Sequence, residues 1–587
     1  MANGLLDQWE LLSPDGNIHL KVITTSDGEI QYSVYRKNTV IFGNSPLGIN
    51  TSVADFTSGL TFMESAERTI SESYPMVCGK KAIYSYACNE IILKFRKNSY
   101  IIYMIFRAQN DGVAYRYYIP GEGRIFVYYE NSGYVIPSDA YGWAMEFVVN
   151  YEGFYLKRTN DELLKGTFGM PLLLNIKDNW ILLSEAAVYS TYCGCHIEGV
   201  KDTNILKVVF APDQKNAIIT EEPFYTPWRV AIIGELSDIV ESTIIESLNP
   251  DCEYGDTTWI KSGRSAWSWW SGDSTKDYAI QTKYIDFAHK MGWEYYLCDA
   301  GWQASWLPEL VEYAREKDIG IFVWYDHKEL KTDEDIYDKF SWLASLGVKG
   351  IKVDFFDSDC QERISVYDKI AIAAYKYHLM VVYHGATKPS GERRRWPHIM
   401  TREGILGAEY YKWSDGPTAE HNCTVPFTRN AVGPMDYTPV IFSKEIAQTT
   451  RAHQLALGVI FESNIQHFAD KPEAYENIGE ALDFLKKCPA TWDDTLFIDG
   501  YPGKYVTIAR KSSGKWFIGS ICGGNISRTV SINLSFLGDG EYIADIYEDD
   551  SAMKIQHLAK KVDKNMRLEF PIEVNGGCVI QINQIIN

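Results

Sequence analysis

The sequence of 587 residues lacks the features of a membrane protein, a disulfide-rich secreted protein or a nucleic-acid-binding protein. No run of 18 apolar residues occurs, so no segment is suited to span a bilayer. The segment 1–10 has no basic stretch followed by an apolar run, and no signal peptide is visible. We therefore expect a cytoplasmic protein, or a periplasmic one if a leader has been removed. The 11 cysteines are odd in number and scattered, and Cys193-Gly194-Cys195 is too tight for a zinc knuckle, so we interpret them as reduced thiols.

Basic residues are in deficit, with 57 Lys and Arg against 77 Asp and Glu, a net charge of −20. This balance argues against nucleic acid or an anionic membrane as a partner and fits a neutral substrate or a bound cation. Aromatic residues are abundant, with 17 Trp and 39 Tyr. Such a content is typical of surfaces that stack on sugar rings, although β-rich proteins also place aromatic residues on strands. The oligomeric state is left open.

Three domains are predicted from changes in pattern along the chain. Residues 1–250 contain short alternating segments, such as 18–22 and 91–95, separated by turn residues, which indicates a β-sandwich. In residues 251–488, strand-like and helix-like segments alternate. Residues 489–587 return to alternating β-patterns, which predicts a second, small β-sandwich.

The middle domain has the pattern of a (β/α)₈ barrel. Apolar residues at helical spacing end at Gly292 and Gly347, as expected where glycine closes a helix. Strand starts recur about every 25–30 residues, and eight such units fill roughly 250 residues. The last strands are expected at 399–403, 423–427 and 459–462, followed by a helix over 474–487. A doubly wound sheet is the alternative, but no G-x-G-x-x-G sequence opens a helix here.

Polar or aromatic residues end five consecutive predicted barrel strands, where active sites of barrel enzymes collect. Each one alone is explained equally well as a turn or a helix cap, but five in register indicate a catalytic site. The residues that we expect to bind substrate there are Asp299, Trp324, Lys352 and His384.

Lys352 and Asp354 are two positions apart on one strand, so both side chains point to the same side. The lysine would lower the pKa of the aspartate and keep it ionised, as a nucleophile requires. A buried structural ion pair is the alternative. Farther on, Glu403 and Glu409 flank a loop with two glycines. Such a loop suits a hard cation or an acid/base residue, or it carries two solvated glutamates.

These motifs resemble glycoside hydrolase family 97 over nearly the whole length. The string Gly433-Pro434-Met435-Asp436-Tyr437-Thr438-Pro439 is the most specific, and three further segments support it: 183–187, 350–359 and 383–389. Inverting members carry a glutamate directly after the fifth-strand histidine, where this chain has Gly385. The resemblance therefore implies the retaining branch, with Asp354 as nucleophile and Glu409 as general acid/base.

The resemblance also implies a Ca²⁺ ion with Glu185, Glu403 and Glu409 as ligands, and an exo-acting enzyme that cleaves terminal α-galactosides. β-L-Arabinopyranosides or α-glucosides are the alternative substrates within the family. The basic run Arg393-Arg394-Arg395 fits either the lining of the site or a solvated loop.

Two other classes of protein compete with this interpretation. A carbohydrate-binding protein on a degenerate barrel predicts the loss of one key carboxylate, and both are present. A phosphate-binding isomerase or aldolase predicts a Schiff-base lysine in apolar surroundings, whereas Lys352 has an acidic neighbour.

Overall fold

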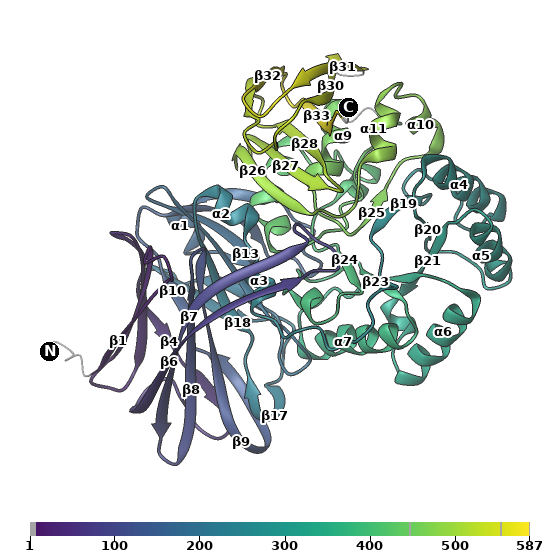
Figure 1. Cartoon of the computed structure of the whole chain (residues 1–587). Coiled ribbons are helices and arrows are strands. Elements are labelled where there is room, and N and C mark those ends of the chain that lie inside the picture. Colours follow the sequence, from purple (N-terminus) through teal and green to yellow (C-terminus); the bar gives the residue numbers. More distant parts are fainter. Residues whose placement is uncertain (1–6, 445–447, 552–553, 586–587) are drawn as a thin grey trace.

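A computed structural model describes residues 7–444, 448–551 and 554–585. Residues 1–6 lie outside this range, and the expectation that no signal peptide is present depends partly on them. The chain forms an N-terminal β-sandwich, a central barrel surrounded by helices and a C-terminal β-domain (Figure 1). In the described residues, no helix has the length and apolar character of a membrane span. All 11 cysteines are free thiols.

The N-terminal domain packs a four-stranded antiparallel sheet, β1–β4, against a large sheet of 14 strands. A continuous apolar core fills the space between them, because alternate side chains along the strands point inward. Two short helices, α2 and α3, lead from its last strand toward the barrel. The elements are β1 (Gln8–Leu12), β2 (Ile18–Thr24), β3 (Ile30–Arg36), β4 (Thr39–Leu47), β5 (Ile49–Thr51), β6 (Thr61–Pro75), β7 (Ile83–Lys97), β8 (Tyr100–Gln109), β9 (Gly112–Glu130), β10 (Gly133–Val135), β11 (Tyr141–Glu146), β12 (Tyr155–Thr159), α1 (Asn160–Leu163), β13 (Thr167–Ile176), β14 (Asn179–Ala186), β15 (Cys195–Gly199), β16 (Ile205–Phe210), β17 (Ile218–Tyr225), β18 (Trp228–Gly234), α2 (Leu236–Glu241) and α3 (Ile244–Ser247).

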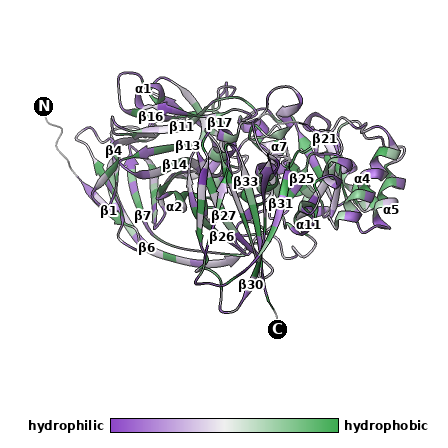
Figure 2. Cartoon of the chain, turned by 90° about the horizontal axis from the view of Figure 1, so that it is seen from above, coloured by the Kyte–Doolittle hydropathy of each residue, from purple (hydrophilic) through white to green (hydrophobic). Residues whose placement is uncertain are grey.

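The central domain is a nearly closed barrel of seven parallel strands in the order β24-β23-β22-β21-β20-β19-β25. Its outer helices bury an apolar face on the strands and expose a polar one, which appears as alternating colours on α4 and α5 in Figure 2. The elements are β19 (Gly263–Trp267), α4 (Tyr278–Met291), β20 (Tyr295–Cys298), α5 (Leu307–Arg315), β21 (Gly320–Asp326), η1 (His327–Glu329), α6 (Asp333–Leu346), β22 (Gly350–Asp354), α7 (Gln361–Lys376), β23 (Met380–Tyr383), η2 (Glu392–Arg394), β24 (Ile399–Arg402), η3 (Ala408–Lys412), α8 (Ala419–Thr424), η4 (Val425–Phe427), η5 (Arg429–Val432), α9 (Arg451–Ile460), β25 (Ile465–Phe468), α10 (Pro472–Glu476) and α11 (Ala481–Lys487).

The predicted barrel is confirmed, but two of its predicted strands are wrong. Residues 423–427 are helical, in α8 and η4, and residues 459–462 overlap the end of α9. Both segments are short apolar runs, for which burial alone does not distinguish helix from strand. Where an eighth strand would close the barrel, a single parallel bridge joins Arg402 to Met435. This bridge brings the segment after η5 to the edge of the site.

Glycine ends the barrel helices as predicted, with Gly292 after α4 and Gly347 after α6 in the left-handed region. The helix predicted over 474–487 is instead two helices, α10 and α11. Gly479 lies between them with φ +63°, a conformation that interrupts a right-handed helix.

The C-terminal domain packs a six-stranded antiparallel sheet, in the order β26-β27-β28-β33-β30-β31, on the two-stranded sheet β29-β32. One apolar cluster joins the two sheets, as expected for a small sandwich. The strands are β26 (Asp494–Tyr501), β27 (Tyr505–Ser512), β28 (Lys515–Cys522), β29 (Arg528–Asn533), β30 (Tyr542–Ser551), β31 (Lys554–Val562), β32 (Arg567–Ile572) and β33 (Gly577–Gln584).

The three domains meet around buried charges. The tip of the β6–β7 hairpin inserts Lys80, whose Nζ donates to the backbone oxygens of Val240, Ser242 and Ala431. Arg393, from the predicted basic run, is also buried and pairs with Glu246 and Glu462. The run is therefore neither a solvated loop nor a lining of the active site, because its first two arginines are enclosed between domains.

Candidate active site

The carboxyl ends of β20 to β23 bring the predicted site residues together. Asp299 directly follows β20, Trp324 lies in β21, Lys352 and Asp354 lie in β22, and His384 directly follows β23. Ionic contacts or hydrogen bonds join them into one cluster. The register explains this result, because parallel strands align their carboxyl ends on one rim of the barrel.

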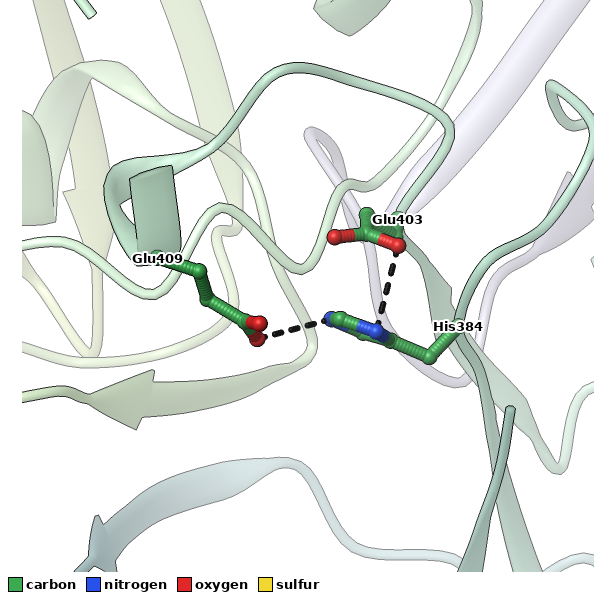
Figure 3. Close-up of side chains that lie close together, drawn as sticks. All are labelled: His384, Glu403 and Glu409. Atoms are coloured by element: carbon green, nitrogen blue, oxygen red, sulfur yellow. Dashed lines mark ion pairs between the residues drawn. The ribbon is translucent and has the colours of Figure 1, made fainter. Parts of the chain in front are cut away.

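His384 is the centre of the cluster. Its Nδ1 lies 3.1 Å from Glu403 and 3.5 Å from Asp354, and its Nε2 lies 3.1 Å from Glu409. Figure 3 shows Glu403 and Glu409 facing the two ring nitrogens from different sides. Burial would lower the pKa of His384, but Glu403 and the other carboxylates raise it well above its ordinary value. The ring is therefore an imidazolium that faces both predicted catalytic acids.

Asp354 is an ionised carboxylate. Burial favours its neutral form, but the positive charge and hydrogen bond of His384, and then the charge of Lys352, lower its pKa to about 2. The indole N–H of Trp324 donates to its Oδ2 at 2.9 Å, and the N–H of Phe355 donates to its Oδ1 at 2.7 Å. The predicted lysine effect is thus present, but the histidine contributes more.

Lys352 lies among three carboxylates rather than against Asp354 alone. Its Nζ is 3.7 Å from Asp299, 3.6 Å from Glu409 and 3.7 Å from Asp436. Burial opposes its charge, but the three acids raise its pKa above the ordinary value. A permanently protonated amine does not form a Schiff base, so the geometry disfavours an aldolase-like role.

Glu152, on the loop between β11 and β12, is a site residue that the sequence did not reveal. Burial raises its pKa to about 7, and the negative charges of Glu409 and Asp354 add to that effect. Burial likewise raises the pKa of Glu403 well above its usual range, with a further contribution from Glu152. The site therefore holds more acid than its two cations can neutralise, which favours protons or a bound cation.

The structure does not bring Glu185 into this cluster. Its Oε1 accepts hydrogen bonds from Lys388 and from the N–H of Cys195, and its Oε2 accepts one from Arg229. Two cations thus neutralise a carboxylate that the resemblance assigned to calcium. In the N-terminal domain, Glu152 is a carboxylate whose negative charge raises the pKa of Glu403.

Three buried polar atoms of the cluster, Glu409 Oε1, Asp436 Oδ2 and His384 Nε2, make ionic contacts with one another or with Lys352 but no well-aligned hydrogen bond. Such atoms can still accept or donate hydrogen bonds to a bound ligand. Asp436 is a second residue missed as a functional group, although its motif is part of the specific string found in the sequence. Its Oδ1 is fixed by His467 at 2.9 Å, and its Oδ2 is directed toward Lys352 and His384.

Comparison with known protein families agrees with this architecture. The model described as "Glycosyl-hydrolase 97 N-terminal" matches residues 11–250, "Glycoside hydrolase 97" matches 259–405, and "Glycosyl-hydrolase 97 C-terminal, oligomerisation" matches 491–583. A Streptomyces bingchenggensis protein named a probable retaining alpha-galactosidase is 32% identical over 96% of this chain and 90% of its own. The chain belongs to glycoside hydrolase family 97. It is a glycoside hydrolase, so the non-catalytic alternative is not needed.

Two further relatives are similar to this chain over nearly its whole length. A retaining alpha-galactosidase from Bacteroides thetaiotaomicron is 28% identical over 97% of this chain and 94% of its own. A crystal structure named beta-arabinopyranosidase is 29% identical and has a TM-score of 0.91, covering 98% of this chain and 100% of the other.

Gly385 is required by the close packing around Asp354. A Cβ at this position would lie 2.8 Å from Phe355 N, 2.9 Å from Phe355 Cα and 3.0 Å from Asp354 Oδ1. The residue also has φ +49°, which favours glycine. A larger residue here, such as the glutamate expected of inverting members, would collide with the turn that carries Asp354.

The cluster fits a hard cation. Ligand atoms of His384, Glu403 and Glu409 lie within 4.8 Å of one another, and the negative charge of Glu152 acts on Glu403. Ca²⁺ prefers oxygen ligands, so the three glutamates would hold it and His384 would supply the neighbouring positive charge or yield its proton. Bound calcium would supply positive charge that keeps the surrounding carboxylates ionised.

Proposed function

We propose that the protein is a retaining, exo-acting glycoside hydrolase that cleaves terminal α-galactosides by double displacement. The observation that carries this proposal is that Asp354 and Glu409 contact the same imidazolium ring, while electrostatics keep Asp354 ionised. The names of the two alpha-galactosidase relatives support the choice of sugar and of retention.

In the first step, an Asp354 carboxylate oxygen attacks the anomeric carbon and the bond to the leaving oxygen breaks. Glu409 donates its proton to that oxygen, so the leaving group departs as a neutral alcohol. In the second step, Glu409 takes a proton from water, whose oxygen attacks the anomeric carbon and releases Asp354. The sugar product retains the configuration of the substrate.

The remaining residues are proposed to position these groups. Trp324 holds one oxygen of Asp354 by a hydrogen bond, which leaves its other lone pairs for attack. Lys352 attracts Glu409 and Asp436, and Asp299 accepts a hydrogen bond from Trp267. Asp299, Asp436 and Lys352 are suited to bind ring hydroxyls, because each offers a charged donor or acceptor.

We further propose that a Ca²⁺ ion binds Glu403, Glu409 and Glu152, and that catalysis depends on it. A ligand role alternates with acid/base catalysis at Glu409, because a metal ligand is deprotonated whereas a general acid carries a proton. Removing calcium with a chelator is expected to weaken catalysis or substrate binding. Unchanged kinetics after verified metal removal would exclude the dependence.

The decisive test is a panel of nitrophenyl glycosides with product stereochemistry followed by NMR. We expect hydrolysis of the α-galactoside with retention. Asp354→Ala should lose activity that azide partly restores, with the glycosyl azide formed in the opposite anomeric configuration. Initial release of the inverted sugar by the wild type would refute the mechanism.

β-L-Arabinopyranosidase activity is a second candidate, favoured by the solved relative of that name. The two sugars share ring geometry and differ by a hydroxymethyl group. The ratio of kcat/KM for the two nitrophenyl glycosides distinguishes them. A missing methylene in a pocket changes such ratios by about 10- to 200-fold, so the preferred substrate will be evident.

A further inference from the structure

An exposed tryptophan lies four residues after the proposed acid/base Glu409. Trp413 follows η3, the short helix that carries Glu409, and 62% of its surface is exposed. An exposed indole close in sequence to a catalytic residue is suited to contact the substrate, because its apolar face can stack on a sugar ring. We infer that Trp413 forms the subsite for the sugar of the leaving group, and this inference rests on the proposed role of Glu409.

The position relative to Glu409 argues for the leaving-group side. A general acid must lie beside the glycosidic oxygen that it protonates, and that oxygen belongs to the leaving group. Trp413, which directly follows the short helix that carries this acid, is therefore placed toward the part of the substrate that departs. The nucleophile Asp354 lies on another element, the strand β22.

Aromatic contacts lead from the catalytic cluster to Trp413. Lys352 Nζ lies over the ring of buried Trp267, and Trp267 stacks on Trp269 with 5.5 Å between ring centroids. Trp269 in turn contacts Trp413 at 5.7 Å. The series begins at a residue 1% exposed and ends at the exposed Trp413, a direction suited to a sugar chain that extends into solvent.

The ring of Trp413 is held without being covered by its two aromatic neighbours. Trp269 and Tyr410 lie at interplanar angles of 62° and 82° to it, so neither is stacked on its face. An oriented ring that is 62% exposed can stack on the C–H face of a pyranose.

The faces of Trp269 are less available. Lys412 Nζ lies 3.9 Å from the centre of this ring and donates to the backbone oxygen of Trp269 at 2.6 Å, and Trp267 stacks on the ring as well. Trp413 is therefore the platform, and Trp269 supports it. The substrate class that this predicts is an oligosaccharide with a pyranose in the leaving group.

The experiment compares two substrates that share the glycone: a glycosyl fluoride and a disaccharide. Fluoride has no ring to stack, so Trp413→Ala should leave its kcat/KM within about twofold while lowering that of the disaccharide roughly 10- to 100-fold. With the fluoride as donor, transfer of the glycosyl group to an added sugar acceptor should fall relative to hydrolysis. Tyr128→Ala removes another exposed aromatic side chain, in β9, and should change neither ratio.

Different results would refute the proposed glycone and the proposed leaving-group subsite. A wild-type enzyme inactive on α-galactosyl fluoride refutes galactose as the glycone, and the pair is then measured with the L-arabinosyl compounds. Equal effects of Trp413→Ala on fluoride and disaccharide, or no effect on either, refute the leaving-group subsite. Trp413→Phe should restore most of the disaccharide activity, because a ring is restored.

Discussion

Replacement of Gly385 by alanine tests a close contact between two loops. The loop after β23, which contains Gly385, packs against the turn after β22, and we expect this contact to set the position of the nucleophile Asp354. The new Cβ would be 2.8 Å from a backbone nitrogen of Phe355, where ordinary contact begins at 3.4 Å. The turn after Asp354 must therefore move by about half an ångström. Because Gly385 N also donates to Glu403 Oε2 at 2.7 Å, the same movement weakens that bond.

The expected effect on catalysis is large for a single methyl group. A displacement of 1 Å in a reacting group can lower the rate about 10²-fold, so a shift of roughly half that size should lower kcat/KM about 10-fold. Alanine in the left-handed region should also cost about 1–2 kcal/mol of stability. The assay is kcat/KM for a nitrophenyl α-galactoside, which reports the step in which Asp354 attacks, together with a thermal melt.

Gly292→Ala is the matched control. Gly292 has φ +65°, similar to Gly385, but no atom lies within 4 Å of the position that a Cβ would take there, at the end of α4. The Gly292→Ala variant should be destabilised about as much as Gly385→Ala but should keep wild-type kcat/KM. If Gly385→Ala retained wild-type kcat/KM with the same loss of stability as the control, packing against the nucleophile would have no part in its role.

Further predictions concern the calcium ligands, the buried ion pairs of Glu185 and the dependence of stability on pH. Glu152→Gln should weaken calcium binding at least about 10-fold by calorimetry, whereas Glu185→Gln should leave it unchanged and destabilise the fold by about 3–5 kcal/mol, since Arg229 and Lys388 lose a partner. The reverse pattern would restore Glu185 as the ligand. Burial lowers the pKa of His398 from 6.5 to about 4, so the unfolded chain binds more protons and stability is lost as pH falls from about 6.5 to 4, by about 1.4 kcal/mol per unit. His398→Asn should reduce this slope in denaturant titrations and exposed His289→Asn should not; equal slopes in all three proteins would contradict the assignment.

Local patterns in the sequence were sufficient for the barrel and for most of the site. Helix ends at Gly292 and Gly347 and five strand ends could be recognised, because periodicity and capping depend on neighbours in the chain. The same reasoning failed for 423–427, where a short apolar run is compatible with either helix or strand. Parallel pairing then aligned Asp299, Lys352 and His384 at one rim without further information.

The contacts that complete the site depend on how the domains dock. The negative charge of Glu152, on a loop of the sandwich, raises the pKa of Glu403, whereas Glu185, on β14 of the same sandwich, is neutralised by Arg229 and Lys388. Nothing near either residue in the sequence distinguishes them. Arg393 is likewise buried only because Glu246 and Glu462 approach it from other parts of the chain. The sequence thus determined which chemical groups are present and on which elements, and the tertiary structure decided which carboxylates remain free to act, since pairing and burial of charge arise from residues distant in the chain.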